Sequence, residues 1–338
     1  ARFFLPNNEG APNLPGLSRY IAVPEGAKAS VTLADYRIET VQNVEIAPSP
    51  RIPWETERGA LEYKKDESIY NRNAFYPENP VILSATTEIR GVDAVMLGIT
   101  PFQYNPVTKE LKIYRDIKLE VNFTGGNGYF GEDRLRSRWW DPLLSDIFIN
   151  EASLPEVNYN HTYQNTKDIG CEYLIVVPND PEFQAWGDSI KNFRTLQGIM
   201  SDVITLDDIG TNTTTGLESY FNSAFNSWDI VPSAVLLIGD YGINADNTII
   251  SPIWDNYCVS DNIYADVNEN KMPDIIFARI TAQNEAQLEV MVSKFPRTER
   301  TPPTSEEFYN HPITALGWQT ERWFQICSET VGGFLKNK

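Results

Sequence analysis

The sequence has few cysteines and histidines, and it has no long apolar run. Its 338 residues contain 3 cysteines and 2 histidines. Because the cysteines are odd in number and lack Cys-x-x-Cys spacing, they define neither a disulfide framework nor a zinc site. No apolar run approaches the ~18 residues that a membrane-spanning helix needs. With 41% hydrophobic residues, the chain is expected to be a globular protein without a membrane span.

Basic side chains are also scarce relative to acidic ones. The chain carries 28 lysines and arginines against 46 aspartates and glutamates, which gives a net charge of -18. A charge of this sign repels a phosphate backbone and argues against general binding of nucleic acid. We therefore do not expect DNA or RNA as a partner.

The first half of the chain has the residue alternation of β-strands. Apolar and polar residues alternate from Tyr20 to Pro48 and again from Val81 to Phe123, which is the period of a half-buried strand. NPVTKE, residues 105–110, lies between two apolar runs and supplies the proline and polar residues of a hairpin turn. An antiparallel β-sandwich is the simplest way to close these strands.

The pattern changes near Asn160, where we place a domain boundary. A chain of 338 residues exceeds what one hydrophobic core usually organises. The boundary gives a β-rich domain with a C-terminal connector, residues 1–160, and an α/β domain, residues 161–338. The expected strands of the second domain are CEYLIVVP, SDVITL, SAVLLIGD, DIIFARI and HPITALGW. The expected helices are PEFQAWGDSIKNFRTLQG, LESYFNSAFNSW, NEAQLEVMVSKFPRT and ERWFQICSETVGGFL.

The strands of the second domain are almost continuously apolar, which favours a mostly parallel sheet covered on both faces. In such a sheet the loops that carry function gather at the carboxyl ends of the strands. This rule directs attention to Asp240, to Arg279 and to the WQTE segment at 318–321.

Several segments resemble one enzyme family. The prodomain of gingipain-type cysteine peptidases, family C25 of clan CD, is similar to NLPGLSRYIAVPEGA, NAFYPENPVILS, RGVDAVMLGITPFQYNPVTKEL and FTGG. The first subdomain of that family's catalytic domain is similar to YLIVVP, AVLLIGD, SDNIYADVNENKMPDIIFARI and TALGWQTERWFQICSE. The resemblance implies a multidomain β + α/β protein. Its N-terminal antiparallel β-sandwich would be followed by a caspase-like, doubly wound α/β subdomain with a mostly parallel sheet.

The resemblance also implies a secreted bacterial proenzyme that hydrolyses peptide bonds with a cysteine thiolate and a histidine partner. In the family the histidine lies in a Gly-His-Gly-like segment, and the cysteine follows at a later strand end. Neither segment appears before Lys338. His161 lies in the polar connector and His311 at the entry of an expected strand, so neither matches. We expect the Cys/His dyad downstream, and this fragment alone to be inactive.

The three cysteines are poor candidates for a nucleophile. Cys171 begins an apolar strand, and Cys327 has helical spacing with Trp323 and Phe324, so we interpret both as small core residues. Cys258, in the loop WDNYCVSDN, has no neighbouring base to activate its thiol. We therefore expect no catalytic nucleophile in this chain.

Glu321 is the one candidate for a supporting or specificity acid. It lies between the expected strand ITALGW and the expected helix ERWFQIC, and the family has functional acids near that step. Its carboxylate would orient the missing histidine or pair with a basic substrate side chain. Alternatively, it is an acid in a first helical turn, where the helix dipole favours it.

The loop DVNENKMPD, residues 266–274, has oxygen-bearing side chains at alternate positions. Positions one, three, five and nine are Asp or Asn, and position seven offers a main-chain carbonyl; the five candidate ligands are Asp266, Asn268, Asn270, Met272 and Asp274. Hard oxygen donors at this spacing favour a structural Ca²⁺ site. The loop departs from the short integrin-type calcium loops at Lys271, where glycine normally permits the sharp turn. The alternative is a polar loop whose Asp and Asn side chains cap their own turn.

Three arginines alternate beside two tryptophans in GEDRLRSRWWDP. Arg134, Arg136 and Arg138 would form either a stacked surface cluster with Trp139 and Trp140 or an inserted inhibitory segment. In gingipain-type zymogens the prodomain covers the active-site region, which permits the second interpretation. The sequence does not select one of these arginines.

Two classes of function therefore stand. The first is the N-terminal portion of a secreted, gingipain-like cysteine endopeptidase proenzyme. It would act on protein or peptide substrates through the complete enzyme and could retain an associated C-terminal catalytic fragment. The second is a noncatalytic, calcium-stabilised surface or binding protein that keeps the peptidase scaffold. Both place the chain outside the cell or at its surface.

Overall fold

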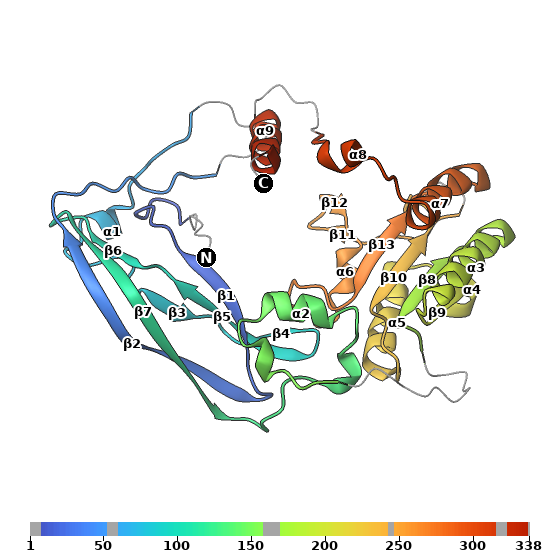
Figure 1. Cartoon of the computed structure of the whole chain (residues 1–338), viewed down its shortest axis with the longest axis horizontal. Coiled ribbons are helices and arrows are strands. Elements are labelled where there is room, and N and C mark those ends of the chain that lie inside the picture. The colour runs from blue at the N-terminus through green and yellow to red at the C-terminus, as the bar shows by residue number, and fades with distance from the viewer. Residues whose placement is uncertain (1–7, 53–59, 158–169, 243–246, 316–322, 337–338) are drawn as a thin grey trace.

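The computed structural model describes residues 8–52, 60–157, 170–242, 247–315 and 323–336. Figure 1 shows a β-sheet region at one end of the chain and a helix-covered sheet at the other, with the connector between them. No helix in the described ranges is both long enough and apolar enough to cross a membrane.

The N-terminal region consists of two antiparallel sheets. The first has the strand order β1-β5-β3, with β4 also paired to β5. Its strands are β1 (Leu17–Ala22), β3 (Val81–Leu83), β4 (Thr87–Ile89) and β5 (Val92–Ile99). The second has the order β2-β7-β6. Its strands are β2 (Ala27–Val41), β6 (Phe102–Asn105) and β7 (Glu110–Gly125), and the short helix α1 (Glu67–Tyr70) lies between β2 and β3 in the sequence.

The two sheets pack face to face as the residue alternation predicted. Ile21, Val95 and Leu97 of the first sheet are buried against Leu119 and Val121 of the second, because successive side chains of a strand point to opposite faces. The predicted turn joins β6 to β7. Within it, the side chain of Asn105 accepts hydrogen bonds from the main-chain N–H groups of residues 107 and 108, at 3.1 and 3.3 Å. The prediction of an antiparallel sandwich is confirmed.

The C-terminal region contains a parallel sheet with the strand order β13-β10-β8-β9. Its strands are β8 (Tyr173–Val177), β9 (Ser201–Thr205), β10 (Ala234–Ile238) and β13 (Ile276–Ile280). One face packs on α3 (Pro181–Leu196) and α7 (Glu285–Arg300). The other packs on α5 (Thr214–Ser227) and α6 (Asn262–Ala265), and α4 (Leu206–Ile209) directly follows β9. The doubly covered parallel sheet is confirmed.

Local sequence explains where the long helices begin. Asp180 precedes Pro181 at the start of α3, and its carboxylate accepts hydrogen bonds from the N–H groups of Glu182 and Phe183, at 2.8 and 3.2 Å. Asn284 caps α7 in the same way. Such side chains satisfy N–H groups that have no partner inside the helix. The helices then bury one apolar stripe on the sheet.

The last part of the chain differs from the prediction. It contains the hairpin β11 (Ile253–Trp254) and β12 (Cys258–Val259), and the helices α8 (Glu306–Asn310) and α9 (Trp323–Lys336). Residues 311–315, the first five of the eight residues of the expected strand HPITALGW, form no strand, and Ile313 is 92% exposed. A strand requires a hydrogen-bonded neighbour, and these residues have none in the described sheets. The predicted helix at the C-terminus is confirmed as α9.

The connector, which follows β7 and precedes β8 in the sequence, packs on both regions. It contains a 3-10 turn at Asp133–Leu135 and the helix α2 (Asp141–Ile147). Leu135 belongs to the core of the α/β region, whereas Leu144 and Phe148 belong to the core of the sandwich. The predicted boundary near Asn160 lies outside the described residues.

Candidate functional site

The sandwich meets the α/β region at the turn between β4 and β5. We call this contact the junction; it comprises the Arg90–Gly91 turn, connector residues 131–141 and loop 266–274. Arg90 and Gly91 have φ angles of 50° and 74°, as a two-residue type I′ hairpin requires. A Cβ atom on Gly91 would lie 2.2 Å from Leu135 Cδ1, so only glycine permits this approach of the turn to the connector.

The side chain of Arg90 enters the α/β region and is 1% exposed. Its Nε donates to the carbonyl of Leu135 at 2.9 Å. Its Nη1 donates to the carbonyls of Pro232 and Asp274, at 3.0 and 2.5 Å. The guanidinium also lies 5.2 Å from the ring centres of both Trp140 and Phe225. Main-chain oxygens and aromatic faces thus replace the water that a buried cation loses.

Burial has an electrostatic cost at this position. It lowers the pKa of Arg90 to about 9, and the nearby carboxylate of Asp274 opposes that shift. Arg90 is still protonated at neutral pH. The junction therefore holds a buried positive charge whose partners are supplied by both the connector and the α/β region.

The loop predicted to bind calcium forms the other side of the junction. The carboxylate of Asp266 accepts hydrogen bonds from the N–H groups of Asn270 and Lys271, at 2.9 and 2.7 Å. The side-chain oxygen of Asn270 accepts from the N–H of Met272 at 2.9 Å. Lys271 has a φ angle of 70°, so the sharp turn forms at the position where calcium loops place glycine.

Asp274, the last predicted ligand, is 1% exposed. One carboxylate oxygen accepts from the N–H of Arg90 at 3.2 Å, and the other accepts from the N–H of Val267 at 3.1 Å. Burial raises the pKa of Asp274 to about 6, although these two hydrogen bonds act in the opposite direction. This carboxylate therefore connects the loop to the sandwich turn.

Two further residues of the loop contact the sandwich directly. Asn270 Nδ2 donates to the carbonyl of Glu88, in the middle of β4, at 2.5 Å. Met272 packs on the sandwich core, and its sulfur accepts a hydrogen bond from the hydroxyl of Tyr20 at 3.6 Å. The loop therefore serves as a docking surface, a use that the sequence did not predict.

The donor chemistry of the loop suits calcium only in part. In the ranges that the structure covers, no group of three or more His, Cys, Asp or Glu side chains is arranged to hold a metal ion. The loop contributes the carboxylates of Asp266 and Asp274, two side-chain amides and the carbonyl of Met272. Amide and carbonyl oxygens would have to complete the coordination. The same carboxylate and amide oxygens cap the loop's own turns, so the metal site and the capped polar loop both remain open interpretations.

The three arginines of the connector also bind the α/β region or the connector itself. Arg134 donates to the carbonyl of Phe225 at 2.6 Å. Arg136 forms a bidentate pair with Asp141, with both distances at 2.8 Å. Arg138 donates to the carboxylate of Glu172 at 3.2 Å and to the carbonyl of residue 198. These contacts support the interpretation as a structural cluster.

The carboxyl edge of the parallel sheet has an arginine of its own, which is half-buried. Arg279, in β13, forms a bidentate pair with Asp261, with both distances at 2.8 Å. Its Nη1 donates to the carbonyls of Gly239 and Ile249. Asp240 lies at the same edge, where a hydrogen bond from Gln283 lowers its pKa. The WQTE segment and Glu321 lie outside the described residues, so their predicted roles stay predictions.

The cysteines divide into one buried and two exposed residues. Cys171 is 2% exposed in the core of the α/β region, which confirms its predicted place, and this burial raises the pKa of its thiol to about 12. Cys327, on α9, is exposed, so its predicted place in a core is wrong. Cys258 is exposed in β12.

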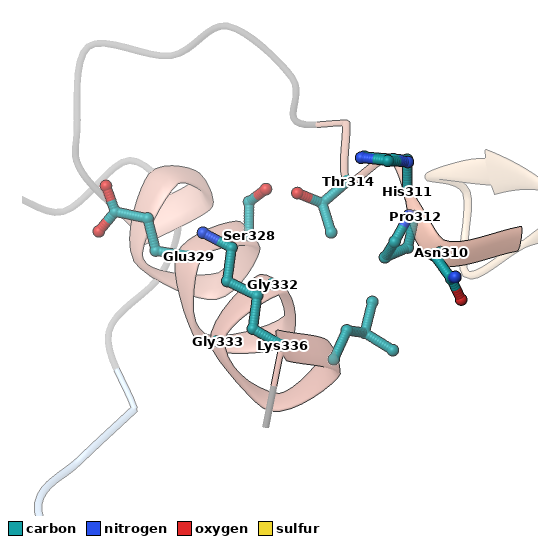
Figure 2. A pocket seen from close by; sticks show the side chains of 10 residues that line it. Asn310, His311, Pro312, Thr314, Ser328, Glu329, Gly332, Gly333 and Lys336 are labelled. Carbon is teal, nitrogen blue, oxygen red and sulfur yellow. The ribbon is translucent and has the colours of Figure 1, made fainter. Parts of the chain in front are cut away.

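His311 lies in the α8–α9 region, and His161 lies outside the described residues. The Nδ1 of His311 is 2.7 Å from the carbonyl of Glu307. Figure 2 shows His311 at one side of a pocket whose opposite wall is helix α9, with Ser328 and Glu329. This pocket is remote in the sequence from the junction and contains no cysteine.

Comparison with known proteins identifies both halves of the chain. Residues 6–129 match the model Propeptide_C25, and residues 166–329 match the model described as Peptidase family C25. The chain belongs to peptidase family C25. It carries the propeptide of that family followed by the beginning of the peptidase domain.

Curated relatives show the same extent of similarity. Gingipain R2 of Porphyromonas gingivalis is 23% identical over 313 residues, which cover 91% of this chain and 40% of the relative. Lys-gingipain of the same organism is 20% identical over 318 residues, which cover 91% of this chain and 18% of the relative. The chain therefore spans well under half the length of these C25 peptidases.

Solved structures of the family are also similar. The complex of Porphyromonas gingivalis RgpB pro- and mature domains is 29% identical, covers 44% of this chain and 77% of its own, and has a TM-score of 0.39. The Arg-specific cysteine proteinase gingipain R (RGPB) is 16% identical, covers 52% of this chain and 41% of its own, and has the same TM-score of 0.39.

Arg90, the central residue of the junction, was not predicted as a functional residue. An Arg-Gly pair between two short apolar strands indicates a solvent-exposed turn, because charged residues are rarely buried. One feature of the sequence could have drawn attention to Arg90. The segment RGVDAVMLGITPFQYNPVTKEL, which carries part of the family resemblance, begins with this arginine.

Proposed function

We propose that this chain is the N-terminal part of a gingipain-like cysteine endopeptidase proenzyme, in which the C25 propeptide is docked on the first part of the peptidase domain. The observation that carries the proposal is the order of the two matches along one chain, residues 6–129 and 166–329. The extensive junction between the two regions supports it.

The dyad is expected in the part of the peptidase that this chain does not span. A thiolate would attack the carbonyl carbon of a peptide bond, and an imidazole would pass a proton to the leaving amine. Cys171 is buried in the core of the α/β region, which removes one of the three cysteines of this chain as a candidate nucleophile. The carboxyl edge of the parallel sheet, near Asp240 and Arg279, is where further strands would bring such groups.

Three finer features belong to the same proposal. Family membership supports secretion or surface exposure in a bacterium. It also supports a zymogen that is activated by loss of the propeptide. The turn geometry of loop 266–274 supports a structural Ca²⁺ ion, held by the oxygens of Asp266, Asn268, Asn270, Met272 and Asp274.

An activity-based probe tests the proposal. The complete protein, purified with any fragments that remain associated, would be treated with a peptidyl acyloxymethyl ketone and analysed by intact mass and peptide mapping. We expect the probe on a cysteine outside this chain. Labelling of Cys258 or Cys327 would overturn the placement of the dyad. No labelling of an otherwise folded protein would favour the noncatalytic surface or binding protein.

A further inference from the structure

The junction lies at the amino edge of the parallel sheet. Glu172 directly precedes β8 and accepts hydrogen bonds from Arg138 and Trp139 of the connector. Ser233 directly precedes β10, and its carbonyl accepts from Trp140 Nε1 at 3.0 Å. The connector thus contacts the starts of two neighbouring strands.

Arg90 adds contacts at the same edge from a different part of the sequence. It donates to the carbonyl of Pro232, two residues before β10, and to that of Asp274, two residues before β13. Figure 1 shows β4 and α2 beside the ends of the strands that lie away from α7. The carboxyl ends of the same strands, with Asp240 and Arg279, are at the opposite side of the sheet. Functional loops of parallel sheets gather at that opposite side.

The contacts across the junction differ in character from a surface ion pair. On the α/β side, Arg90 finds two carbonyls, a carboxylate that accepts from its main-chain N–H, and the ring of Phe225. All of these groups are withdrawn from water, because Arg90 and Asp274 are each 1% exposed. Removing the guanidinium would leave the carbonyls without a donor and a cavity between two rings.

We propose that Arg90 is the anchor that holds the propeptide on the α/β region after the chain between them has been cut. The proposal rests on the proposed function only in naming the two partners as propeptide and peptidase. It adds one place of attachment, at the amino edge of the sheet, and the residue that determines it. The contacts of Arg134 and Trp140 extend the same surface and are secondary to the buried guanidinium.

A cleavable chain converts the junction into a measurable binding equilibrium. A site for a sequence-specific protease would be placed within residues 158–169, and the folded chain would be cut and diluted. Analytical ultracentrifugation or interferometry then gives the dissociation constant of the two pieces. We expect the wild-type pieces to remain together at micromolar concentration.

Arg90→Ala is expected to raise the dissociation constant on the order of 100-fold, because truncating one partner of a buried charged contact mainly accelerates dissociation. The matched control is Arg115→Ala, since Arg115 pairs with Glu39 on the exposed face of β7; a change of less than about threefold is expected there. Gln283→Ala, at the carboxyl edge, should have an equally small effect.

Equal dissociation constants for Arg90→Ala and Arg115→Ala, or separation of the wild-type pieces, would overturn the proposal. A large effect of Gln283→Ala would move the docking surface to the opposite edge.

Chemical rescue separates lost docking from lost folding. Ethylguanidinium at millimolar concentration should restore association of the Arg90→Ala pieces, whereas ethylammonium, with the same charge, should not. If Arg90→Ala does not fold before cutting, Arg90→Gln takes its place, and a constant equal to that of Arg115→Ala again refutes the anchor. Because no peptidase assay is involved, failure of the complete protein to hydrolyse peptides would leave this result unchanged.

Discussion

Two arginines, the buried Arg90 and the half-buried Arg279, lie at opposite edges of one parallel sheet and serve different purposes. Arg279 is paired with the carboxylate of Asp261 and with carbonyls of neighbouring loops, all within the α/β region. Arg90 bonds to carbonyls from the connector and from two α/β loops. The first arrangement stabilises one domain, whereas the second joins two. The two arginines therefore require different tests.

The largest expected effect is that of Arg90→Ala in the uncut chain. We expect a loss of about 3–5 kcal/mol in the free energy of unfolding, as for other buried charges deprived of a partner. Urea denaturation should be used, because guanidinium would fill the vacated position. The two regions should then unfold in separate transitions. A loss within ~0.5 kcal/mol, as expected for the surface control Arg115→Ala, would contradict the burial of Arg90 at the junction.

Arg279→Ala tests the other side of the comparison. We expect the free energy of unfolding of the α/β region to fall by about 2–4 kcal/mol, because the carboxylate of Asp261 would lose its bidentate partner. The sandwich should keep its stability. Hydrogen exchange followed by mass spectrometry should show faster exchange between residues 239 and 261. Exchange in β2 and β7 should stay the same. Faster exchange throughout the sandwich would show that the two arginines are not independent.

A pH titration sharpens the comparison through Asp274. Its pKa is raised to about 6 in the folded chain, above the ~3.9 of an unfolded aspartate. The folded state therefore binds the proton more tightly, so stability increases as pH falls through about 6. We expect a gain of up to ~2 kcal/mol between pH 7.5 and pH 4.5 relative to Asp274→Asn, which lacks this titration. Melting temperatures of both proteins over that range provide the measurement, with a calcium chelator present because Asp274 is also a proposed Ca²⁺ ligand. A steeper loss of stability on acidification in the wild type would contradict it.

The smallest effect is expected from calcium at loop 266–274. After chelation, titration calorimetry should detect binding, and Ca²⁺ at tenfold excess over its dissociation constant should stabilise the chain by about 1.4 kcal/mol. Asp266→Ala should abolish both signals, whereas Asp35→Ala, an exposed carboxylate on β2, should abolish neither. Absence of heat together with an unchanged melting temperature would leave the capped polar loop as the correct interpretation.

The elements of the fold were predictable where the signal is local. Alternation over β2 and β7, the apolar runs of β8 and β10, and the capped helix α3 each encode their structure within a few residues. The prediction of a strand at 311–315 was wrong, because an apolar run forms a strand only beside another strand. The prediction that Cys327 is a core residue was wrong, because helical spacing identifies a face of α9 without showing whether another element covers that face.

The junction could not be predicted from the sequence, for a related reason. Leu135, Pro232 and Asp274 are 45, 142 and 184 residues from Arg90 in the sequence. No periodicity connects positions so distant. Three of the four atoms that accept hydrogen bonds are main-chain oxygens, which every residue type has, so the sequence does not distinguish them. Loop 266–274 could be selected by its composition, but its second use as a docking surface depends on what it touches.

The reliance of Arg90 on main-chain carbonyls has an evolutionary consequence. Every residue type presents the same carbonyl oxygen, so substitutions at positions 135 and 232 can change the side chains and preserve the acceptors, provided that the backbone path is kept. The arginine and the following glycine are the members of this arrangement that chemistry does not allow to vary. Divergent homologues can thus retain one joining geometry with little sequence in common around it.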